Sequence, residues 1–271
     1  MTLRKQLLKV QSSKSALLAT NFYNFETLKG IVIAASELNF PIILQTTKSS
    51  IEYMGLKTTV QLARTMIQEH NVQAWLHLDH CHSIELIKAC LDAGYDSVMI
   101  DASEAPMKEN IAITSDVVRM AKAYGAIVEA ELGYVAKLGQ DSTKKGFTEP
   151  EDAKLFVEDT GVDALAVAIG SAHGFYKEPP ELDLDRLQNI AHSTNAFLVL
   201  HGGSGIPADA IRSAVRRGIC KVNLATEIKN AFMQRIASEL RSTKEIDLRI
   251  VFPPAISDVT NLVKEKLNLF L

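Results

Sequence analysis

Short apolar runs alternate with amphipathic segments along nearly the whole chain. The runs have the length and composition of buried strands, and the segments between them repeat apolar residues at helical spacing. Eight runs are predicted as strands: Ala16–Thr20, Pro41–Gln45, Ala74–Asp79, Ser97–Asp101, Ala126–Glu131, Ala164–Gly170, Ala196–Leu200 and Cys220–Asn223. Eight segments are predicted as helices: Glu26–Leu38, Lys57–Glu69, Ser83–Ala93, Lys108–Tyr124, Glu151–Asp159, Asp185–His192, Pro207–Arg217 and Thr226–Leu240.

The alternation predicts an α/β fold. Strand–helix units at this spacing imply parallel strands joined by right-handed crossovers, and eight such units favour a closed (β/α)₈ TIM barrel over an open doubly wound sheet. Glycines follow four of the helices, where a left-handed residue ends a helix well: Gly94, Gly125, Gly161 and Gly218. An N-terminal helix over Leu3–Val10 is expected to close the bottom of the barrel. Pro254–Leu271 is expected to form a C-terminal helical extension, packed outside the barrel or on a partner subunit.

Length and composition bound the answer further. The 271 residues match the typical ~250 of one such barrel, so we expect a single domain over residues 1–271. The net charge of −3 gives no reason to expect nucleic acid or an anionic membrane as partner. No apolar run is long enough to span a bilayer, and Met1–Gln6 lacks the apolar region of a signal peptide. The three cysteines form no CxxC pair and indicate reduced thiols in a cytoplasmic protein.

Three histidines follow the third, sixth and seventh predicted strands, beside a glycine or an acid. They are His80, His173 and His201. A histidine at a strand end is more often an ordinary hydrogen-bonded residue, but the carboxyl ends of barrel strands converge on one mouth. Neutral imidazole is the commonest zinc ligand, and three histidines with an open fourth position form a catalytic arrangement. The sequence therefore predicts a metal site.

Acids lie at the same level of the barrel. Asp79, Asp101 and Glu131 end the third, fourth and fifth predicted strands. Carboxylates there could hold a second metal, orient the histidines or transfer protons, and a helix-capping or loop role is equally open for Asp101. His77 shares strand parity with Asp79 and is expected to fill an interior layer. Cys81 is interpreted as a small buried neighbour rather than a soft metal ligand.

The loops after the last two strands indicate a phosphate site. The first reads His201-Gly202-Gly203-Ser204-Gly205, and the second reads Asn223-Leu224-Ala225-Thr226 before a helix. Glycines let backbone N–H groups approach an anion, and a helix N-terminus favours negative charge. This is the recurrent phosphate position of such barrels. A metal beside it suggests a phosphorylated substrate with metal-polarised oxygens.

These residues resemble the class II, metal-dependent ketose-bisphosphate aldolases of the fructose and tagatose types. The resemblance covers nearly the whole chain through these strings: Asn21-Phe22-Tyr23-Asn24, Leu76–His80, Val98–Asp101, Val128–Gly133, Gly170–Lys177, Leu200–Ser204 and Lys221–Glu227. It implies a lyase that releases dihydroxyacetone phosphate from a ketose bisphosphate.

The resemblance implies a role for each matching residue. His80, His173 and His201 would bind Zn²⁺ or another divalent cation. Asp79 would exchange the proton on the C4 oxygen, and Asp101 and Glu131 would serve a second metal position. The implied substrate-binding residues are Asn24, Gly174, Lys177, Gly202, Gly203, Ser204, Asn223, Leu224, Ala225 and Thr226. A monovalent cation, Na⁺ or K⁺, is implied beside the phosphate.

The chain departs from the family pattern at three places. The loop that usually carries a catalytic Gly-Gly-x-Glu-Asp string reads Gly133–Ser142 here, with Asp141 as the nearest counterpart. Ala225 resembles the tagatose type, whereas Gly203 resembles the fructose type. The familiar C-terminal tail is missing, but Arg249 survives in Asp247-Leu248-Arg249. The resemblance implies that this arginine reaches a neighbouring subunit's site and binds the far phosphate, so a homodimer or homotetramer is expected.

Two other kinds of function compete with this hypothesis. A Schiff-base barrel aldolase needs a lysine pointing into the barrel, and Lys221 is the only fair candidate. A non-catalytic aldolase-like subunit is suggested by the altered loop near Asp141. Another anionic ketose phosphate is a further alternative substrate. A metal-dependent hydrolase is disfavoured because the first strand carries no HxH pair.

Overall fold

The computed structural model of the chain describes residues 1–133, 135, 146–176, 178 and 180–271. Its central element is a barrel of eight parallel strands, which lie at the positions predicted from the sequence. The strands are β1 (Leu17–Asn21), β2 (Ile42–Thr46), β3 (Ala74–Cys81), β4 (Ser97–Ile100), β5 (Ile127–Leu132), β6 (Ala164–Val167), β7 (Phe197–Leu200) and β8 (Ile219–Leu224). The predicted sixth strand was too long: β6 ends at Val167, because beyond it the backbone of Ala168 bonds to Thr148 and the Ile169 carbonyl accepts from Asp183, in place of a neighbouring strand.

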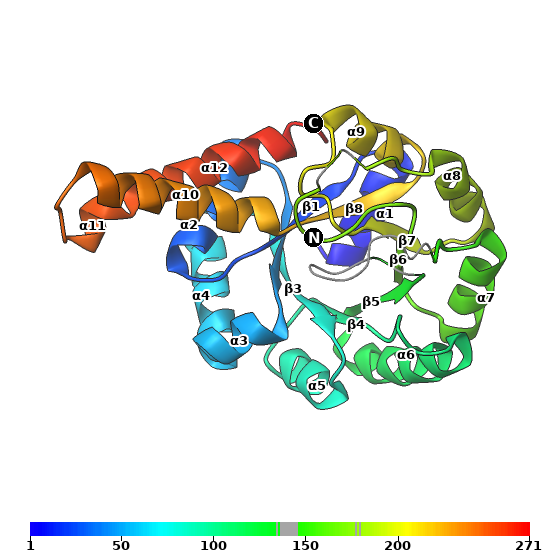
Figure 1. Cartoon of the computed structure of the whole chain (residues 1–271). Helices are drawn as coiled ribbons and strands as arrows, with labels where there is room; N and C mark the ends of the chain where they lie inside the picture. Colours follow the sequence, from blue (N-terminus) through cyan, green and yellow to red (C-terminus); the bar gives the residue numbers. More distant parts are fainter. Residues whose placement is uncertain (134, 136–145, 177, 179) are drawn as a thin grey trace.

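The sheet is closed in sequence order. Each strand pairs in parallel with its neighbours, and β8 returns to β1 with Leu17 opposite Lys221 and Ala19 opposite Asn223. Figure 1 shows the helices forming a ring around the strands. The predicted TIM barrel is therefore confirmed.

Helices follow the strands as predicted. They are α1 (Leu3–Ser13), α2 (Phe25–Glu37), α3 (Lys48–Met54), α4 (Leu56–Glu69), α5 (Ile84–Asp92), α6 (Met107–Ala121), η1 (Lys122–Tyr124), α7 (Pro150–Thr160), α8 (Leu184–Ser193), α9 (Ala208–Arg216), α10 (Thr226–Ser242), α11 (Leu248–Val251) and α12 (Pro253–Leu267). The short helices α3 and α11 were not predicted, since seven and four residues give too little periodicity to read. The four glycines predicted to end helices all have positive φ.

Helix α1 closes the amino end of the barrel, as expected. Leu3, Leu7 and Val10 lie on one face of this helix and are buried. They join a cluster of inward-facing strand residues that includes Trp75 and Phe197. The inside of the barrel is therefore filled by side chains at this end, and the predicted histidines and acids lie at the opposite, carboxyl end.

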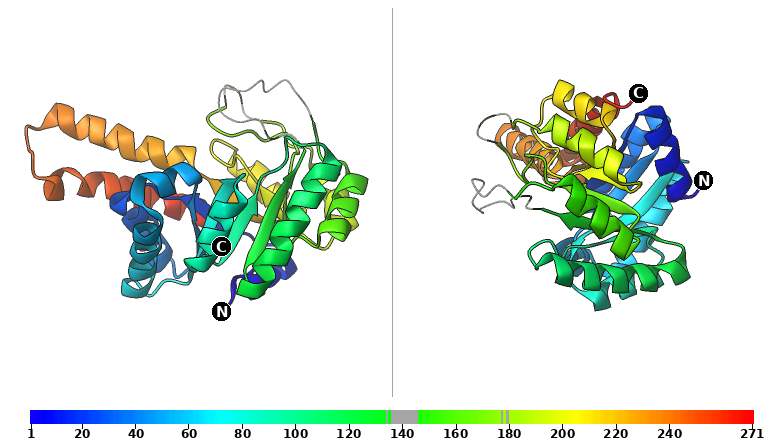
Figure 2. Two further views of the ribbon diagram at one scale, coloured as in Figure 1. Left: turned by 90° about the horizontal axis from the view of Figure 1, so that it is seen from below. Right: turned by 90° about the vertical axis from the view of Figure 1, so that its right-hand side faces the viewer.

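The last three helices form an arm beside the barrel. Helices α10 and α12 run alongside each other, and α11 lies at the far tip (Figures 1 and 2). Helix α12 also packs on α2, where Thr260 Oγ1 donates to the Gly30 carbonyl at 3.2 Å. The expected C-terminal extension thus packs on its own chain. Large apolar side chains stay exposed along the arm: Met233, Leu240, Ile246, Leu248 and Ile250.

Among the residues that the structure describes, no helix combines the length and the apolar character needed to cross a bilayer.

Candidate active site

The end of β3 presents two neighbouring residues to the same mouth. The pairing of β3 with β4 shifts register between Leu78 and Cys81, and His80 within this interval has a φ of 45°. That left-handed conformation costs a non-glycine residue about 1–2 kcal/mol. A regular strand would send Asp79 and His80 to opposite faces, but the irregular end lets both line one cavity.

The three predicted histidines converge. His80 comes from β3, His173 from the loop after β6, and His201 directly follows β7. The Nε2 atoms of His80 and His173 are 3.2 Å apart, and each ring offers one nitrogen within 4.8 Å of the other two. Such a set can hold a metal ion through three imidazoles. The convergence predicted from strand ends is therefore correct.

Carboxylates contact two of the three histidines, His80 and His201. His80 Nδ1 donates to Asp101 Oδ2 at 2.9 Å, and His201 Nε2 donates to Glu129 Oε1 at 2.9 Å. The Nδ1 of His201 also lies 2.8 Å from Glu131 Oε2, although the two are not aligned as a hydrogen bond. Carboxylates that accept from the distal nitrogen fix the tautomer and orientation of a metal-binding imidazole. Asp101 and Glu131 therefore contact the histidines, as the sequence indicated.

The carboxylates control the charge of His201. Burial alone would lower the pKa of this fully buried ring. The hydrogen bond to Glu129 and the charges of Glu129 and Glu131 outweigh burial and raise the pKa to about 10. The surroundings thus strongly favour a positive charge at this position, which either a proton or a cation can supply.

Asp79 is held as an ionised acid. It is 6% exposed, and burial opposes its charge, but the positive charges of His80, His201 and Lys221 keep its pKa below the usual range. Asn21 Nδ2 donates to one carboxylate oxygen at 2.9 Å, and Asn223 Nδ2 donates to the other at 3.3 Å. Asp79 is therefore a fixed carboxylate that can accept a proton from a substrate.

A small cavity joins these side chains to the glycine-rich loops. Its volume is about 30 Å³. It is lined by Asn21, Asp79, His80, His173, Gly174, Gly202, Ser204, Asn223, Ala225 and Thr226. Most of the predicted chemistry therefore meets at one place, at the carboxyl ends of β1, β3, β6, β7 and β8.

The loop after β7 is tightly fixed. Gly202 has a φ of 66°, and a Cβ there would collide with the Ala172 backbone. A Cβ on Gly203 would lie 2.7 Å from the Asn223 carbonyl, which accepts a 2.9 Å hydrogen bond from the Gly203 amide. Tyr176 ties the β6 loop to this one, because its hydroxyl donates to the Gly202 carbonyl at 2.9 Å and accepts from the Ala172 amide. Only glycine fits these two positions.

The N-terminus of α10 faces the same cavity. Its first residue, Thr226, and the preceding N-cap residue, Ala225, line the cavity, and Ala225 has no side chain that could cap the helix. Ser204 Oγ accepts from the Glu227 amide at 3.3 Å, and Glu227 accepts from the Gly205 amide at 2.5 Å. Free N–H groups and the helix dipole make such an end a ready anion site.

Comparison with known proteins decides the family. The family model described as fructose-bisphosphate aldolase class-II matches residues 1–271. The chain is 37% identical over 294 residues to the fructose-bisphosphate aldolase of Helicobacter pylori, covering 97% of this chain and 95% of that protein.

This chain belongs to the class II fructose-bisphosphate aldolase family. It is therefore a metal-dependent aldolase, a lyase. Its fold matches the crystal structure of the YdjI aldolase from Escherichia coli K12 with a TM-score of 0.89 at 31% identity, over 99% of this chain and 96% of that one. The fructose-bisphosphate aldolase of Campylobacter jejuni matches with a TM-score of 0.85 over 99% and 93% of the chains, and at 21% identity it shows the fold alone.

Some predicted site residues of this aldolase lie elsewhere. The Asn24 side chain caps α2 by accepting from the Thr27 amide at 2.9 Å, and Leu224 is buried in β8. Arg249 lies on α11 at the tip of the arm, bonded to Asp247 (Figure 1). Arg249 therefore does not lie at the mouth of its own barrel. Asp141 and Lys177 fall outside the described residues.

Sequence reasoning missed three residues of the aldolase site. Asn21 lines the cavity, Tyr176 joins two loops, and Glu129 forms a buried ion pair with Lys221, which was considered only as a Schiff-base lysine. Glu129 and Glu131 are two residues apart in an otherwise apolar strand, and this spacing sends both side chains inward. That spacing was the available signal for Glu129.

Proposed function

We propose that this aldolase reversibly cleaves a ketose 1,6-bisphosphate, of the tagatose or fructose type, into dihydroxyacetone phosphate and glyceraldehyde 3-phosphate. The observation that carries the proposal is one cavity lined by Asp79, two of the three converging histidines and the N-terminus of α10. These parts supply a base, a metal position and an anion position within reach of one small substrate.

The metal would be held by His80, His173 and His201. The donor set fits a zinc ion, because the distal nitrogens of His80 and His201 are already occupied by Asp101 and Glu129. That leaves Nε2 of His80 and Nδ1 of His201 for the metal. When bound, a divalent cation supplies charge stabilisation at the oxygens on C2 and C3, where negative charge develops during cleavage.

Asp79 is proposed as the base. It would take the proton from the C4 hydroxyl as the C3–C4 bond breaks and its electron pair moves toward C2, leaving an enediolate and an aldehyde. Asn21 and Asn223 keep both carboxylate oxygens oriented during this transfer. In the synthetic direction, Asp79 would return the proton to the same oxygen. Asp141 is proposed to exchange the C3 proton.

The near phosphate is proposed to bind at the two glycine-rich loops. Backbone amides around Gly174, Gly202, Gly203 and Asn223–Thr226, with the Ser204 and Thr226 hydroxyls, would surround it. Lys177 and Asn24 are further candidates, and a Na⁺ or K⁺ ion would balance the charge of the bound phosphate.

Asp101 is proposed mainly to orient His80, because one of its oxygens accepts from Nδ1 of that ring. Glu131 Oε2 lies 2.8 Å from Nδ1 of His201, the nitrogen proposed for the metal, so Glu131 is proposed to lie beside the metal position. A second metal position at these acids, as the resemblance implies, would require them to leave those contacts.

The far phosphate needs a residue from outside this mouth. We propose that Arg249 of a neighbouring copy supplies it in a homodimer or homotetramer, since α11 projects away from its own barrel (Figure 2). A guanidinium suits a phosphate because it can donate two parallel hydrogen bonds. The reduced, buried cysteines suit a cytoplasmic enzyme.

The Schiff-base alternative is disfavoured by the environment of Lys221. Its Nζ lies 2.7 Å from Glu129 Oε2, and its side chain is 3% exposed. An amine held in a buried ion pair with a carboxylate is not free to attack a substrate carbonyl.

A panel of phosphorylated ketoses tests the proposal. Release of dihydroxyacetone phosphate is measured for the fructose and tagatose 1,6-bisphosphates, with and without a chelator. We expect chelator-sensitive cleavage of at least one, and no trapping of the enzyme by borohydride with substrate. Covalent trapping at Lys221 would instead establish the Schiff-base mechanism, and absence of all turnover in the metal-loaded protein would favour a non-catalytic subunit.

A further inference from the structure

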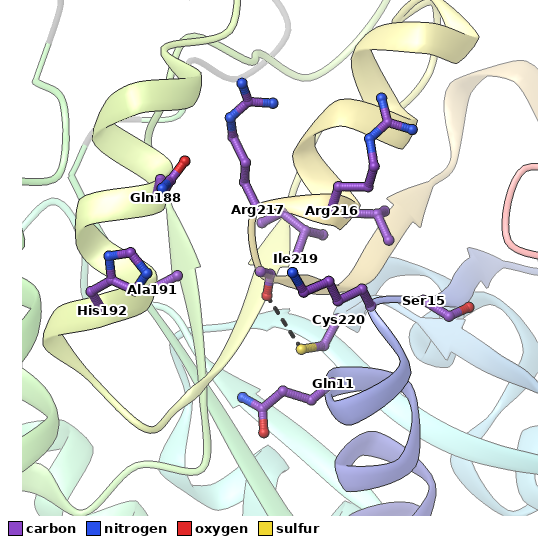
Figure 3. A pocket seen from close by; sticks show the side chains of 12 residues that line it. Gln11, Ser15, Gln188, Ala191, His192, Arg216, Arg217, Ile219 and Cys220 are labelled. Carbon is purple, nitrogen blue, oxygen red and sulfur yellow. Dashed lines mark hydrogen bonds between the residues drawn. The ribbon is translucent and has the colours of Figure 1, made fainter.

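A second cavity lies at the opposite end of the barrel from the histidines. It is bounded by the end of α1, the end of α8, the end of α9 and the start of β8, where Ile219 and Cys220 form part of its wall (Figure 3). Its volume is about 290 Å³, close to the lower end of the range for small-molecule sites. We call it the basal pocket.

The basal pocket is lined by cations and amides. Lys14, Arg216 and Arg217 line it together with His192, and Gln11 and Gln188 add amide groups. None of its twelve lining residues is acidic. In a chain whose net charge is −3, a pocket that gathers three full positive charges without a carboxylate reverses the average character of the surface.

These cations lack the partners that other basic residues have. Arg235 and Arg186, for comparison, are bound by Asp258 and Asp183. Within the described part of the chain, no carboxylate forms an ion pair with Lys14, Arg216 or Arg217. The positive charge of the pocket is therefore not neutralised by a carboxylate of the described residues.

Arg217 carries an unused donor. Its Nε is buried and has no hydrogen-bond partner among the described residues, while Nη1 makes only a 3.4 Å contact with the Ser213 carbonyl. Figure 3 shows the side chains of Arg216 and Arg217 extending in the same direction from the end of α9, with Arg217 on the side of Gln188 and His192 on α8 and Arg216 on the far side. A buried donor without a partner is costly, and an anion in the pocket would satisfy it.

Helix dipoles explain only part of this arrangement. A cation near a helix C-terminus is favourable, and α1, α8 and α9 all end at the basal pocket. Dipole compensation requires neither that the cations share one pocket nor that a guanidinium nitrogen be buried there. Both features suit a phosphate group, which accepts several hydrogen bonds from a guanidinium fork.

We propose that the basal pocket binds a small phosphate-bearing metabolite. The guanidinium groups of Arg216 and Arg217 and the ammonium of Lys14 would bind the phosphate oxygens. The amides of Gln11 and Gln188 would hydrogen-bond to the hydroxyl groups of the remainder. The site is separate from the catalytic mouth, and it does not depend on which sugar the enzyme cleaves.

Hydrogen-exchange mass spectrometry with pyrophosphate tests the pocket and locates binding in the chain. We expect slower exchange in peptides covering residues 186–193 and 213–220, in addition to any change around residues 202–206 at the mouth. The double variant Arg216→Gln/Arg217→Gln should lose the basal protection and bind there about tenfold more weakly or worse. Protection at the mouth should persist. Arg241→Gln removes the same charge from an exposed position on α10 and should leave both sites unchanged.

Two further probes in the same experiment identify the kind of ligand. Inorganic phosphate tests the anion alone, and a monosaccharide bisphosphate tests whether the amides add affinity through hydroxyl groups. Tighter basal binding of the sugar bisphosphate than of phosphate supports a metabolite site. Absence of basal protection by every probe, at concentrations that saturate the mouth, would overturn the proposal. An equal loss in Arg241→Gln would do the same, because it would reduce the effect to net charge.

If circular dichroism shows that the double variant is unfolded, Arg216→Gln alone, at an exposed position, serves as the test and should lose part of the protection.

Discussion

The ammonium of Lys221 on β8 lies 2.7 Å from the carboxylate of Glu129 on β5, inside the barrel. The other oxygen of Glu129 accepts from His201 Nε2 at 2.9 Å. Both charged side chains are almost fully buried, and attraction to Lys221 and His201 overcomes burial to hold the pKa of Glu129 well below its usual range. The pair is thus the support on which one of the proposed metal ligands rests.

Replacing this support should cost both stability and metal affinity. Glu129→Gln keeps the size of the side chain but leaves the Lys221 charge buried without a counterion, so unfolding should become easier by up to about 3–5 kcal/mol. Metal affinity should fall about 10–100-fold, because Glu129 orients His201. Denaturant titration and competition with a metal-binding dye measure the two effects. Glu158→Gln, which disrupts an exposed pair with Lys154, is the control and should change neither. Unchanged metal affinity in the folded Glu129 variant would show that the carboxylate does not orient His201.

Removing the metal should abolish cleavage. His201→Ala should lose the metal while the barrel stays folded, as judged by metal analysis and circular dichroism. His70→Ala, which changes an imidazole at the end of α4 outside the site, should keep both metal and activity. Full activity after verified metal removal would contradict the proposed mechanism.

Asp79→Ala should lower kcat by ~10²–10⁴, the usual contribution of a general acid–base group. Metal content and affinity for dihydroxyacetone phosphate should stay near those of the wild type, because neither depends on the C4 oxygen. Steady-state kinetics and direct binding measure the difference. A rise in KM with unchanged kcat would instead make Asp79 a binding group.

Arg249→Ala should weaken the binding of ketose bisphosphates by about tenfold to a hundredfold. It should barely affect dihydroxyacetone phosphate, which has no second phosphate. Sedimentation should find an oligomer, because the arginine must come from a neighbouring copy. Arg119→Ala, on the exposed face of α6, is the matched control. Equal losses for both ligands, or a fully active monomer, would exclude this role.

The barrel and the histidine set could be predicted from the sequence because both follow from local pattern. Eight apolar runs separated by helices leave few other topologies, and parallel strands bring His80, His173 and His201 to one end whatever the details of packing. Their convergence needed no knowledge of side-chain geometry beyond the strand ends.

Residues whose role depends on pairing across the barrel could not be assigned in this way. Asn21 and Asn24 occur three residues apart in one string, yet Asn21 contacts Asp79 and Asn24 caps α2. Which asparagine reaches the site depends on the exact residues at which β1 ends and α2 begins. The pairing of Glu129 with Lys221 likewise joins β5 to β8, strands separated by two others in the barrel. Sequence spacing does not encode such a contact.

Helix α10 joins the mouth of its own barrel to the arginine that is proposed to serve the mouth of a neighbouring copy. Its first turn faces the cavity, and its last turn leads toward Arg249 on α11. At 1.5 Å per residue its 17 residues set a span of roughly 25 Å, and at 3.6 residues per turn they also set a bearing. One inserted residue would swing the tip by about 100°, whereas seven would return it nearly to its original direction and carry it about 10 Å farther. The length of α10 thus fixes both the distance and the direction of Arg249 from the barrel. A change in that length keeps the direction only when it adds or removes nearly whole helical turns.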